Sequence, residues 1–356
     1  LKKIFVLLRA QTGHDFSQYK PSTIMRRIGR RMAVHQIDAI DGYVKYLQQT
    51  PPEVEALFRD LLIGVTNFFR DPEAFKVLEE KVIPKLFDDK QAGDVVRVWS
   101  TGCSTGEEAY SIAILLQERM ESLKQSYTVQ IFATDIDSRA ITVARAGRYP
   151  ASIAADISPQ RLARFFTREP EGKGYLIHKL IRDTLVFSEQ DVLKDPPFSK
   201  LDLLSCRNVL IYMSAELQKR LIPLFHYALK PGGQLFLGTS ESVGDFADLF
   251  TVIDRKAKLY QRKPDFGGIQ RAALGRILPP VNLTDPVPAE IRVGAKTAIP
   301  GKLPLLELVE RALLKEVAPP SALVNRHGDI LYLYARAGLY LAIAAGDASL
   351  INLIQP

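Results

Sequence analysis

The sequence predicts an α/β protein in which a doubly wound, mainly parallel seven-stranded sheet follows an N-terminal helical domain. Residues 1–90 carry a helical pattern, broken at Gly13, Pro21 and Gly42. From about residue 93, apolar strand-like runs alternate with helical stretches. Alternation of this kind is typical of a parallel sheet that is covered by helices on both faces. We therefore expect a helical domain over 1–90 and a sheet domain over 91–263.

Composition limits the classes of protein. The chain has 356 residues, of which 47% are hydrophobic and 24% charged. This is enough core for one large or two medium globular domains. The net charge of +7 favours an acidic partner, which could be nucleic acid, an anionic membrane or an acidic protein surface. We expect no membrane insertion and no export, because no apolar run of about 18 residues and no signal-peptide pattern occurs. The chain begins at Leu1 without Met, which predicts a fragment of a longer protein.

Two further composition features concern the compartment and metals. Cys103 and Cys206 lie beside predicted strand ends and do not have the spacing of a metal site. We infer a reducing compartment, and the cytoplasm is the expected location. The five histidines are scattered along the chain, so we predict no metal centre.

Within the helical domain, the segment STIMRRIGRRM (22–32) has two opposite faces. On a helix of 3.6 residues per turn, one arc of about 140° holds four arginines and the opposite arc of about 100° holds four apolar residues. The arginines are Arg26, Arg27, Arg30 and Arg31, and the apolar residues are Ile24, Met25, Ile28 and Met32. A solvated surface is the simpler explanation of a charge run. Four arginines with no acid between them repel one another, however, so we favour docking of an anionic partner.

The sheet domain divides into predicted strands and helices. The strands are expected at 95–100, 129–135, 184–191, 201–206 and 234–241, with a final antiparallel pair within 250–262. The helices are expected at 107–123, 138–147, 158–166 and 214–229. The segment 166–186 interrupts this alternation with short strands around glycines, so it predicts a small antiparallel β subdomain.

The C-terminal part has a different character. We expect a linker over 264–303, since the stretch around it is rich in Pro and Gly and lacks periodicity. An amphipathic helix is predicted at 304–317, and two strands within 321–341 joined at His327-Gly328-Asp329. Residues 304–356 therefore predict the start of a further domain.

The most informative segment is VWSTGCSTGEEAYSIA (98–113), which reads as a strand, a small-residue turn and a helix start. Gly102 and Gly106 let a ligand approach the backbone closely. Asp135, at the tip of the next strand, can accept hydrogen bonds from both hydroxyls of a ribose. The turn therefore predicts a nucleoside-containing cofactor.

The type of cofactor follows from the spacing and charge of this turn. The dinucleotide fingerprint GxGxxG holds a pyrophosphate at a helix N-terminus. Here three residues separate the two glycines, and Glu107 and Glu108 start the helix, so a pyrophosphate would be repelled. This argues against an NAD-dependent oxidoreductase. The two acids suit the ammonium and sulfonium groups of S-adenosyl-L-methionine (SAM), although they could instead only oppose the helix dipole.

Four ordered motifs point to one family. They are VTNFFRDPEAF (65–75), VWSTGCSTGEEAYSIA (98–113), ATDID (133–137) and CRNVLIY (206–212). Together they resemble the CheR family of SAM-dependent chemotaxis methyltransferases, which act on glutamates of chemoreceptors, over about residues 1–263. The resemblance implies a Rossmann-like class I methyltransferase fold, SAM as cofactor and S-adenosyl-L-homocysteine (SAH) as product. The segment from 304 resembles the beginning of a PAS domain, as in CheB-CheR-PAS fusion proteins.

The resemblance also assigns site residues. The implied cofactor contacts, together with Gly102 of the turn, are Thr66, Arg70, Glu107, Asp135, Asp191, Val192, Arg207 and Asn208. Gly64 stands where the family often has Asn. The implied catalytic group consists of Arg70, Arg207, Asn208 and Tyr212, in which the arginines steer the incoming carboxylate while Asn208 and Tyr212 shape the pocket. A glutamate carboxylate is ionised near neutral pH, so methylation needs neither a general base nor a metal.

The implied substrate is the acidic helical cytoplasmic region of chemoreceptors, docked on the Arg26–Arg31 face. Fused or separate methylesterase and sensor domains are further expected partners. A nucleic-acid methyltransferase is the main alternative, because DPPF (195–198) resembles the (D/N)PP(Y/F) motif of amino-group methyltransferases. That motif belongs after the fourth strand, where this chain has CRNV, so we expect no nucleic-acid partner. A SAM-binding regulatory module without turnover is the other alternative.

Overall fold

The computed structural model describes residues 1–62, 64–88, 90–91, 93–125, 127–172, 174–264, 321–324 and 330–334. The chain forms two compact units, Leu1–Val281 and Asn282–Pro356. In the second unit, β11 (Ser321–Val324) and β12 (Ile330–Tyr334) form an antiparallel pair, in agreement with the two predicted strands. The predicted linker (264–303), apart from its first residue, and the predicted helix (304–317) lie outside the described residues.

The first unit begins with a helical domain (residues 1–62). Its helices are α1 (Lys2–Thr12), α2 (Pro21–Val34), α3 (Ile40–Gln49) and α4 (Pro51–Leu61). Gly13 ends α1 in a left-handed conformation with φ 76°, and Pro21 occupies the first turn of α2, where its missing N–H costs no hydrogen bond. A core cluster of buried residues joins the four helices, including Leu8, Ile28 and Leu57.

The apolar face of α2 differs from the prediction at one position. Ile24 and Ile28 are buried in the helical core, whereas the side chain of Met25 is 42% exposed. Met25 lies about 100° around the helix from Ile24, so it falls at the edge of the face that packs against the core.

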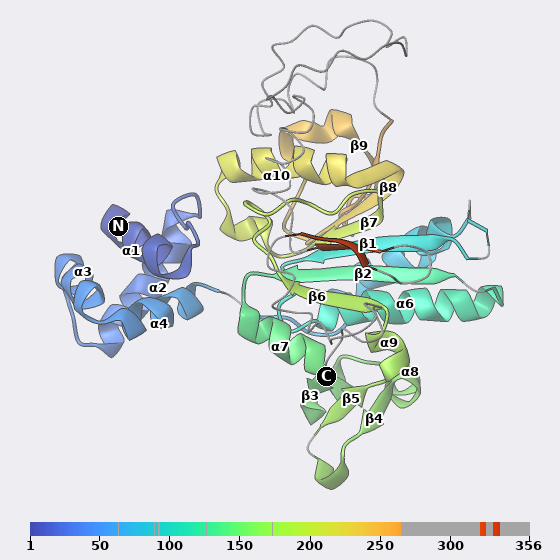
Figure 1. Cartoon of the computed structure of the whole chain (residues 1–356), viewed down its shortest axis with the longest axis horizontal. Helices are drawn as coiled ribbons and strands as arrows, with labels where there is room; N and C mark the ends of the chain where they lie inside the picture. Colours follow the sequence, from blue (N-terminus) through green and yellow to red (C-terminus); the bar gives the residue numbers. More distant parts are fainter. Residues whose placement is uncertain are drawn as a thin grey trace, which may run out of the picture. The chain divides into compact units, whose positions relative to one another are not determined.

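The central sheet follows, and its strands lie in the order β6-β2-β1-β7-β8-β10-β9 (Figure 1). Neighbouring strands are parallel from β6 to β8, and β10 and β9 add an antiparallel edge. This confirms the predicted doubly wound, mainly parallel seven-stranded sheet. The strands are β1 (Val95–Thr101), β2 (Thr128–Asp135), β6 (Leu185–Glu189), β7 (Leu201–Cys206), β8 (Leu229–Leu237), β9 (Phe250–Asp254) and β10 (Leu259–Arg262).

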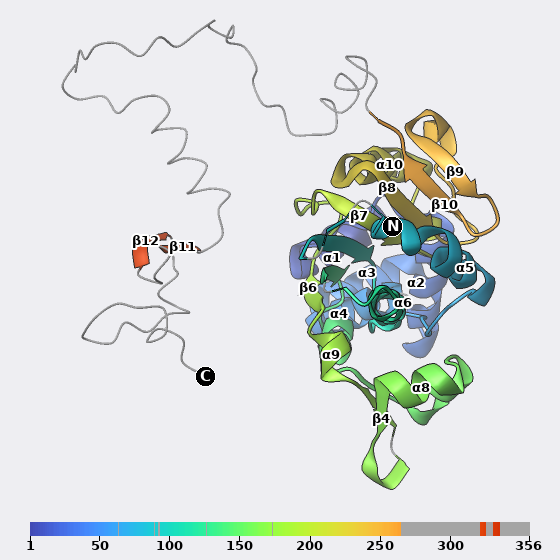
Figure 2. The same ribbon diagram turned by 90° about the vertical axis from the view of Figure 1, so that its right-hand side faces the viewer.

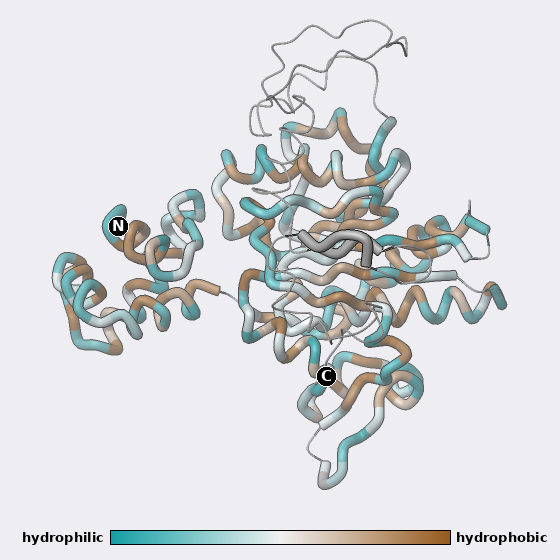
Figure 3. The backbone as a smooth tube through the Cα atoms, in the orientation of Figure 1, coloured by the Kyte–Doolittle hydropathy of each residue, from teal (hydrophilic) through white to brown (hydrophobic). Residues whose placement is uncertain are grey.

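Helices cover both faces of this sheet (Figure 2). One core cluster joins the strands to α6 (Glu107–Leu123), and the other joins them to α10 (Ala215–Ala228). Figure 3 shows hydrophobic residues concentrated along the central strands, as expected for strands that are buried on both faces. Shorter helices are α7 (Ser138–Ala146), α8 (Pro159–Phe165) and α9 (Lys179–Arg182).

The buried residues of the helical segment after residue 70 belong to a core cluster of the sheet and not to the core cluster of α1–α4. This segment consists of α5 (Pro72–Val77), a π-helical turn (Leu78–Val82) and a 3₁₀ turn (Pro84–Leu86). Its buried residues Phe75 and Leu78 belong to the same core cluster as Val98 of β1. The predicted helical domain over 1–90 therefore divides in the structure, because the apolar face of this segment is buried against the sheet. We use "sheet domain" below for residues 64–264.

A three-stranded antiparallel sheet forms the predicted β subdomain. Its strands are β3 (Arg148–Tyr149), β4 (Phe166–Arg168) and β5 (Tyr175–Ile177), in the order β3-β5-β4. It begins before the predicted range of 166–186, since β3 directly follows α7. A two-residue strand gives no alternation that sequence reasoning could detect.

Candidate functional site

A cleft opens at the carboxyl ends of the central strands. β1 lies between β2 and β7, so the chain crosses in opposite directions from β1 and leaves a crevice there, where ligands bind in open α/β sheets. The cleft holds about 1220 Å³ of space, part of it open to solvent. Residues of the helical domain also line it. From the sheet domain it is lined by residues 64–66, 70, 101–104, 108, 134–137, 190–192, 207–209 and 212–213, and from the helical domain by Phe16, Tyr19, Thr23, Ile24, Leu61 and Leu62.

The two glycines of the turn after β1 lie close to other parts of the chain. Gly102 has φ 64°, and a Cβ there would lie 2.5 Å from Cγ2 of Val209 in the loop after β7. Gly106 has φ 95°, and a Cβ would lie 2.9 Å from the Cβ of Ala144. Both positions therefore need glycine for conformation and for space. Gly102 lines the cleft, whereas Gly106 packs the start of α6 against α7.

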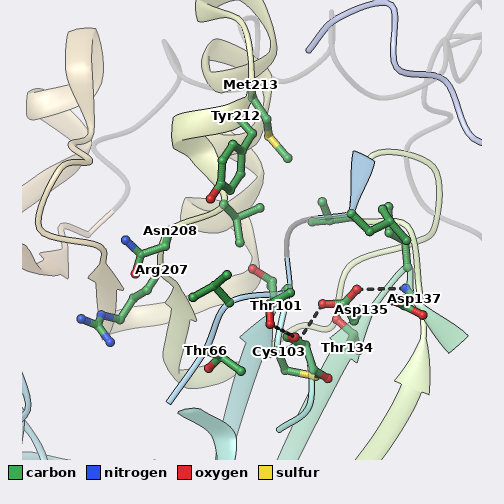
Figure 4. A pocket seen from close by; sticks show the side chains of 18 of the residues that line it. Thr66, Thr101, Cys103, Thr134, Asp135, Asp137, Arg207, Asn208, Tyr212 and Met213 are labelled. Carbon is green, nitrogen blue, oxygen red and sulfur yellow. Dashed lines mark hydrogen bonds between the residues drawn. The ribbon is translucent and has the colours of Figure 1, made fainter. Parts of the chain in front are cut away.

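Asp135 lies at the cleft at the end of β2, as predicted (Figure 4). Its Oδ2 accepts a hydrogen bond from the backbone N–H of Ser104 (2.7 Å), and its Oδ1 accepts one from that of Asp137 (2.9 Å). Burial raises the pKa of Asp135, while these backbone hydrogen bonds oppose the rise. The carboxylate is therefore fixed in orientation by the turn after β1 and the turn after β2. It can accept further hydrogen bonds from a ligand with vicinal hydroxyls.

Asp191 and Val192 line the cleft after β6. Asp191 Oδ2 lies 3.1 Å from Nδ1 of His14 in the helical domain, and its Oδ1 accepts from the backbone N–H of Leu193 (3.0 Å). Burial favours the neutral acid, but these hydrogen bonds and the nearby cations hold the pKa of Asp191 below its ordinary value. This carboxylate therefore joins the two domains at the edge of the cleft. His14 is a contact that sequence reasoning missed.

The two glutamates at the start of α6 differ in their position relative to the cleft. Glu108 lines the cleft, and Glu107 is not among the described residues that do so. The Glu107 carboxylate accepts from Oγ1 of Thr105 (2.7 Å), and burial raises its pKa. Successive residues on a helix point about 100° apart, so only one of the pair can face the cleft. The sequence-based assignment of Glu107 to the cofactor is therefore not matched by its position, and Glu108 occupies that place.

Glu108 belongs to a buried polar network with Arg207. Its Oε1 accepts from Oγ of Ser205 (2.7 Å), and its Oε2 lies 3.5 Å from Nη1 of Arg207. The Arg207 side chain is 0% exposed; its Nη2 donates to Oδ2 of Asp71 (2.7 Å) and to the carbonyl of Arg70 (3.0 Å). The predicted steering role of Arg207 thus does not fit its contacts. Its guanidinium ties the segment that carries Arg70 to the end of β7.

Arg70 and Thr66 lie in the segment that connects the two domains, and both line the cleft. Arg70 Nη1 donates to the carbonyl of Val65 (2.8 Å), and this guanidinium is only half-buried. At Gly64, an added Cβ would lie 3.1 Å from Oγ of Ser104, so a larger residue would crowd the turn after β1. Of the two predicted steering arginines, Arg70 is the one that is partly exposed at the cleft.

The loop after β7 supplies Asn208 and Tyr212 (Figure 4). Asn208 has a left-handed backbone with φ 60°, and its buried Oδ1 has no hydrogen-bond partner among the residues that the structure describes. The carbonyl of Tyr212 accepts from the N–H of Lys20 (2.9 Å), next to the start of α2. The loop therefore lines the cleft and also holds the helical domain.

The four arginines of α2 are not equally accessible. Arg26 is exposed and Arg27 is half-buried. Arg30 is 61% exposed and lies 3.6 Å from Asp60. Arg31 is only 17% exposed, and its Nη2 lies 2.5 Å from Oε2 of Glu53. The prediction that all four form a docking face is therefore wrong for Arg31, which is paired inside the helical domain.

The DPPF segment is accounted for by packing. Phe198 stacks on Phe132 of β2 with ring centroids 4.0 Å apart and meets the edge of Trp99 at 5.3 Å. It therefore packs against one core cluster of the sheet, and none of residues 195–198 lines the cleft. No described feature gives this motif a base-binding role.

The cleft fits SAM. The acids at its wall suit a cationic ligand, Asp135 is oriented for ribose hydroxyls, and Asn208 presents a buried acceptor without a partner. Asp191, Val192 and Glu108 complete the set of residues that would hold the cofactor. This arrangement agrees with the cofactor implied by the turn after β1.

Comparisons with known proteins agree with the assignment of SAM to this cleft. Residues 64–259 match the family described as CheR methyltransferase, SAM binding domain, and residues 1–62 match CheR methyltransferase, all-alpha domain. The chain is 31% identical to chemotaxis protein methyltransferase 1 of Pseudomonas aeruginosa, over 70% of this chain and 92% of that protein. It is 32% identical to chemotaxis protein methyltransferase Cher2 of Pseudomonas putida, over 72% and 96%.

A longer relative is also similar. An uncharacterized 104.1 kDa protein of Rhodobacter capsulatus is 38% identical over 98% of this chain, which spans 36% of that protein's length. Among the helices described, none has the length and apolar character needed to cross a membrane. On its two matching domains and its SAM-binding cleft, the chain belongs to the CheR methyltransferase family.

Proposed function

We propose that this protein transfers the methyl group of SAM to glutamate side chains of methyl-accepting chemoreceptors, giving glutamate methyl esters. The observation that carries this proposal is the position of α2. Its first turns contribute Thr23 and Ile24 to the cleft, and Arg26 and Arg30 follow within two turns on the exposed side. An acidic helical receptor segment that binds these arginines is therefore held next to the cofactor site.

The proposed methyl transfer requires little acid–base catalysis. Bound SAM supplies an electrophilic methyl group on a sulfonium. The acceptor carboxylate, with an ordinary pKa of about 4.3, is already ionised and needs no general base. Catalysis then rests on holding the carboxylate oxygen in line with that methyl group, and such positioning can supply about 7 kcal/mol or more.

Different residues of the cleft bind the cofactor, orient the acceptor carboxylate and position the segment that carries Arg70. Asp135 and Asn208 hold the cofactor, and Arg70 orients the incoming carboxylate. Arg207 holds the Arg70 segment through Asp71 and the Arg70 carbonyl. Tyr212 closes the wall beside the helical domain. Residues of both domains line the cleft, so a bound nucleophile is partly shielded from water, which strengthens these electrostatic contacts.

The biological setting is part of the same proposal. The acceptor is the acidic cytoplasmic region of a chemoreceptor, so the protein acts in the cytoplasm. The long Rhodobacter capsulatus relative supports a place within a fusion of the CheB-CheR-PAS kind.

Charge reversal on α2 tests the docking step. We expect R26E/R30E to reduce methyl transfer to receptor cytoplasmic fragments by about tenfold or more, because two attractive surface contacts become repulsive. SAH binding, measured by isothermal titration calorimetry, stays unchanged. The control K2E/K3E makes the same change in net charge on exposed positions of α1 and leaves transfer within about twofold. Equal loss in both variants contradicts docking on α2, as does full activity of R26E/R30E.

A further inference from the structure

Glu241 is a buried acid of the sheet domain that the cleft lining does not include. Glu241 follows β8 and is 5% exposed. Its Oε2 accepts from the backbone N–H groups of Gly238 (2.7 Å) and Asn208 (2.9 Å), and its Oε1 accepts from that of Ile211 (3.2 Å). Two of these donors belong to the loop after β7, so one carboxylate joins the ends of two neighbouring strands. Glu241 is not among the described residues that line the cleft.

The loop that Glu241 holds is conformationally unusual. Asn208 has φ 60°, in a region that costs a non-glycine residue about 1 kcal/mol or more. This conformation turns the Asn208 N–H toward Glu241 while its side chain lines the cleft. Without an acceptor there, the N–H groups of Asn208 and Ile211 would lose these hydrogen bonds. A buried unpaired N–H is unfavourable, so the loop would take another conformation.

Gly238 packs closely against both the Glu241 carboxylate and the backbone of Asn208. A Cβ at Gly238 would lie 2.7 Å from Oε2 of Glu241 and 2.8 Å from the backbone nitrogen of Asn208. Its φ is not in the left-handed region, so glycine is needed here for space and not for backbone conformation. The Glu241 carboxylate and the loop after β7 both pack against Gly238, so a larger residue at this position would displace them.

We propose that Glu241 is a positioning residue for methyl transfer: it fixes the loop after β7 so that Asn208 and Tyr212 are presented to the cofactor cleft. Glu241 acts through backbone amides and touches neither cofactor nor acceptor. Burial raises its pKa, and the amide donors favour its charged form. The role of Glu241 in methyl transfer rests on the proposed function. Its role in shaping the cofactor-binding cleft does not depend on that function.

Three variants test the inference. We expect E241A to weaken SAH binding by tenfold or more, since buried N–H groups lose their acceptor. E241Q keeps one acceptor oxygen but turns an NH₂ group toward a backbone donor, so its effect is smaller than that of E241A. G238A keeps the carboxylate and displaces it, so it weakens SAH binding even though Glu241 is present. G238A and E241Q also keep the test valid if E241A does not fold.

Asp202 provides the matched control. It lies on β7, near the strand's amino end, where it accepts from the N–H of Arg97 (2.8 Å) and pairs with Lys230 (3.1 Å). D202N is expected to lower thermal stability while SAH affinity remains unchanged. Hydrogen exchange of the amides in residues 207–213 gives a second readout. It accelerates in E241A and G238A and stays at the wild-type rate in D202N.

The inference is overturned if folded E241A and G238A bind SAH with wild-type affinity. It is also overturned if D202N loses as much affinity as E241A at equal loss of stability, since Glu241 would then have only a structural role. Failure of the proposed function is a separate result. If the wild-type protein binds SAH but methylates no receptor fragment, the receptor proposal fails. The SAH-binding and hydrogen-exchange measurements still test the positioning role of Glu241.

Discussion

The helical domain and the sheet domain each bury a carboxylate, and they hold it in different ways. In the helical domain, Glu53 is 4% exposed and is surrounded by side chains. It accepts from Arg31 Nη2 (2.5 Å), from Oη of Tyr43 (2.7 Å) and lies 2.7 Å from Nε2 of His35. A full cationic charge therefore neutralises this acid.

In the sheet domain, backbone N–H groups of Ser104 and Asp137 hold Asp135. They supply dipoles and no net charge. Burial raises the pKa of Asp135, whereas the contacts with Arg31, Tyr43 and His35 outweigh burial and lower the pKa of Glu53. In this pair, the charge of Glu53 is matched by Arg31 within the helical domain, whereas Asp135 is held by backbone dipoles and lines the cleft.

The largest expected effect comes from removing the ligand-binding acid. We expect D135A to weaken SAH binding about a hundredfold or more, because two charge-assisted hydrogen bonds are lost, each worth about 1.5–3 kcal/mol. Isothermal titration calorimetry measures this, with E53Q as the control that keeps wild-type affinity. Binding by D135A within threefold of wild type would show that Asp135 does not hold the cofactor.

The stability effect of Glu53 is the next largest. E53Q leaves Arg31 partly buried without its main partner, so we expect the free energy of unfolding at pH 7 to fall by about 2 kcal/mol. Urea denaturation followed by circular dichroism measures the change. A loss below about 0.5 kcal/mol would mean that the Glu53 network behaves as a surface ion pair does.

The pH dependence gives the smallest effect, and its sign follows from the lowered pKa of Glu53. A folded-state pKa below the ordinary value of 4.5 means that the stabilisation is fully present above about pH 4.5. It is lost as the pH falls through the folded-state pKa. The stability difference between wild type and E53Q should therefore narrow below pH 4.5. Denaturation at pH 6.0, 4.5 and 3.5 measures it, and a gap that widens with acid would refute the assignment.

Much of the sheet domain could be predicted, for a physical reason. Strands buried on both faces must be apolar along their whole length, so runs such as 95–100 and 201–206 stand out. Their carboxyl ends meet at one edge, so Asp135 lines the same cleft as Asp191 and Asn208, the two residues that the family resemblance implied.

Other features depend on partners that a local pattern cannot show. Arg31 is one of four arginines in its segment, and its pairing with Glu53 on another helix removes it from the exposed face. Glu107 and Glu108 are adjacent in sequence, and the rotation of α6 decides which one lines the cleft. Glu241 gives no sequence signal, since its partners are backbone N–H groups.

We propose that the sheet domain transfers methyl groups to receptor carboxylates that are docked on the helical domain. The most direct test incubates the protein with methyl-labelled SAM and chemoreceptor cytoplasmic fragments, then treats the product with alkali. We expect label on the receptor fragment that alkali releases as volatile methanol, as for a glutamate methyl ester. Alkali-stable label, label on added nucleic acid instead, or no transfer from SAM that is demonstrably bound would contradict this proposal.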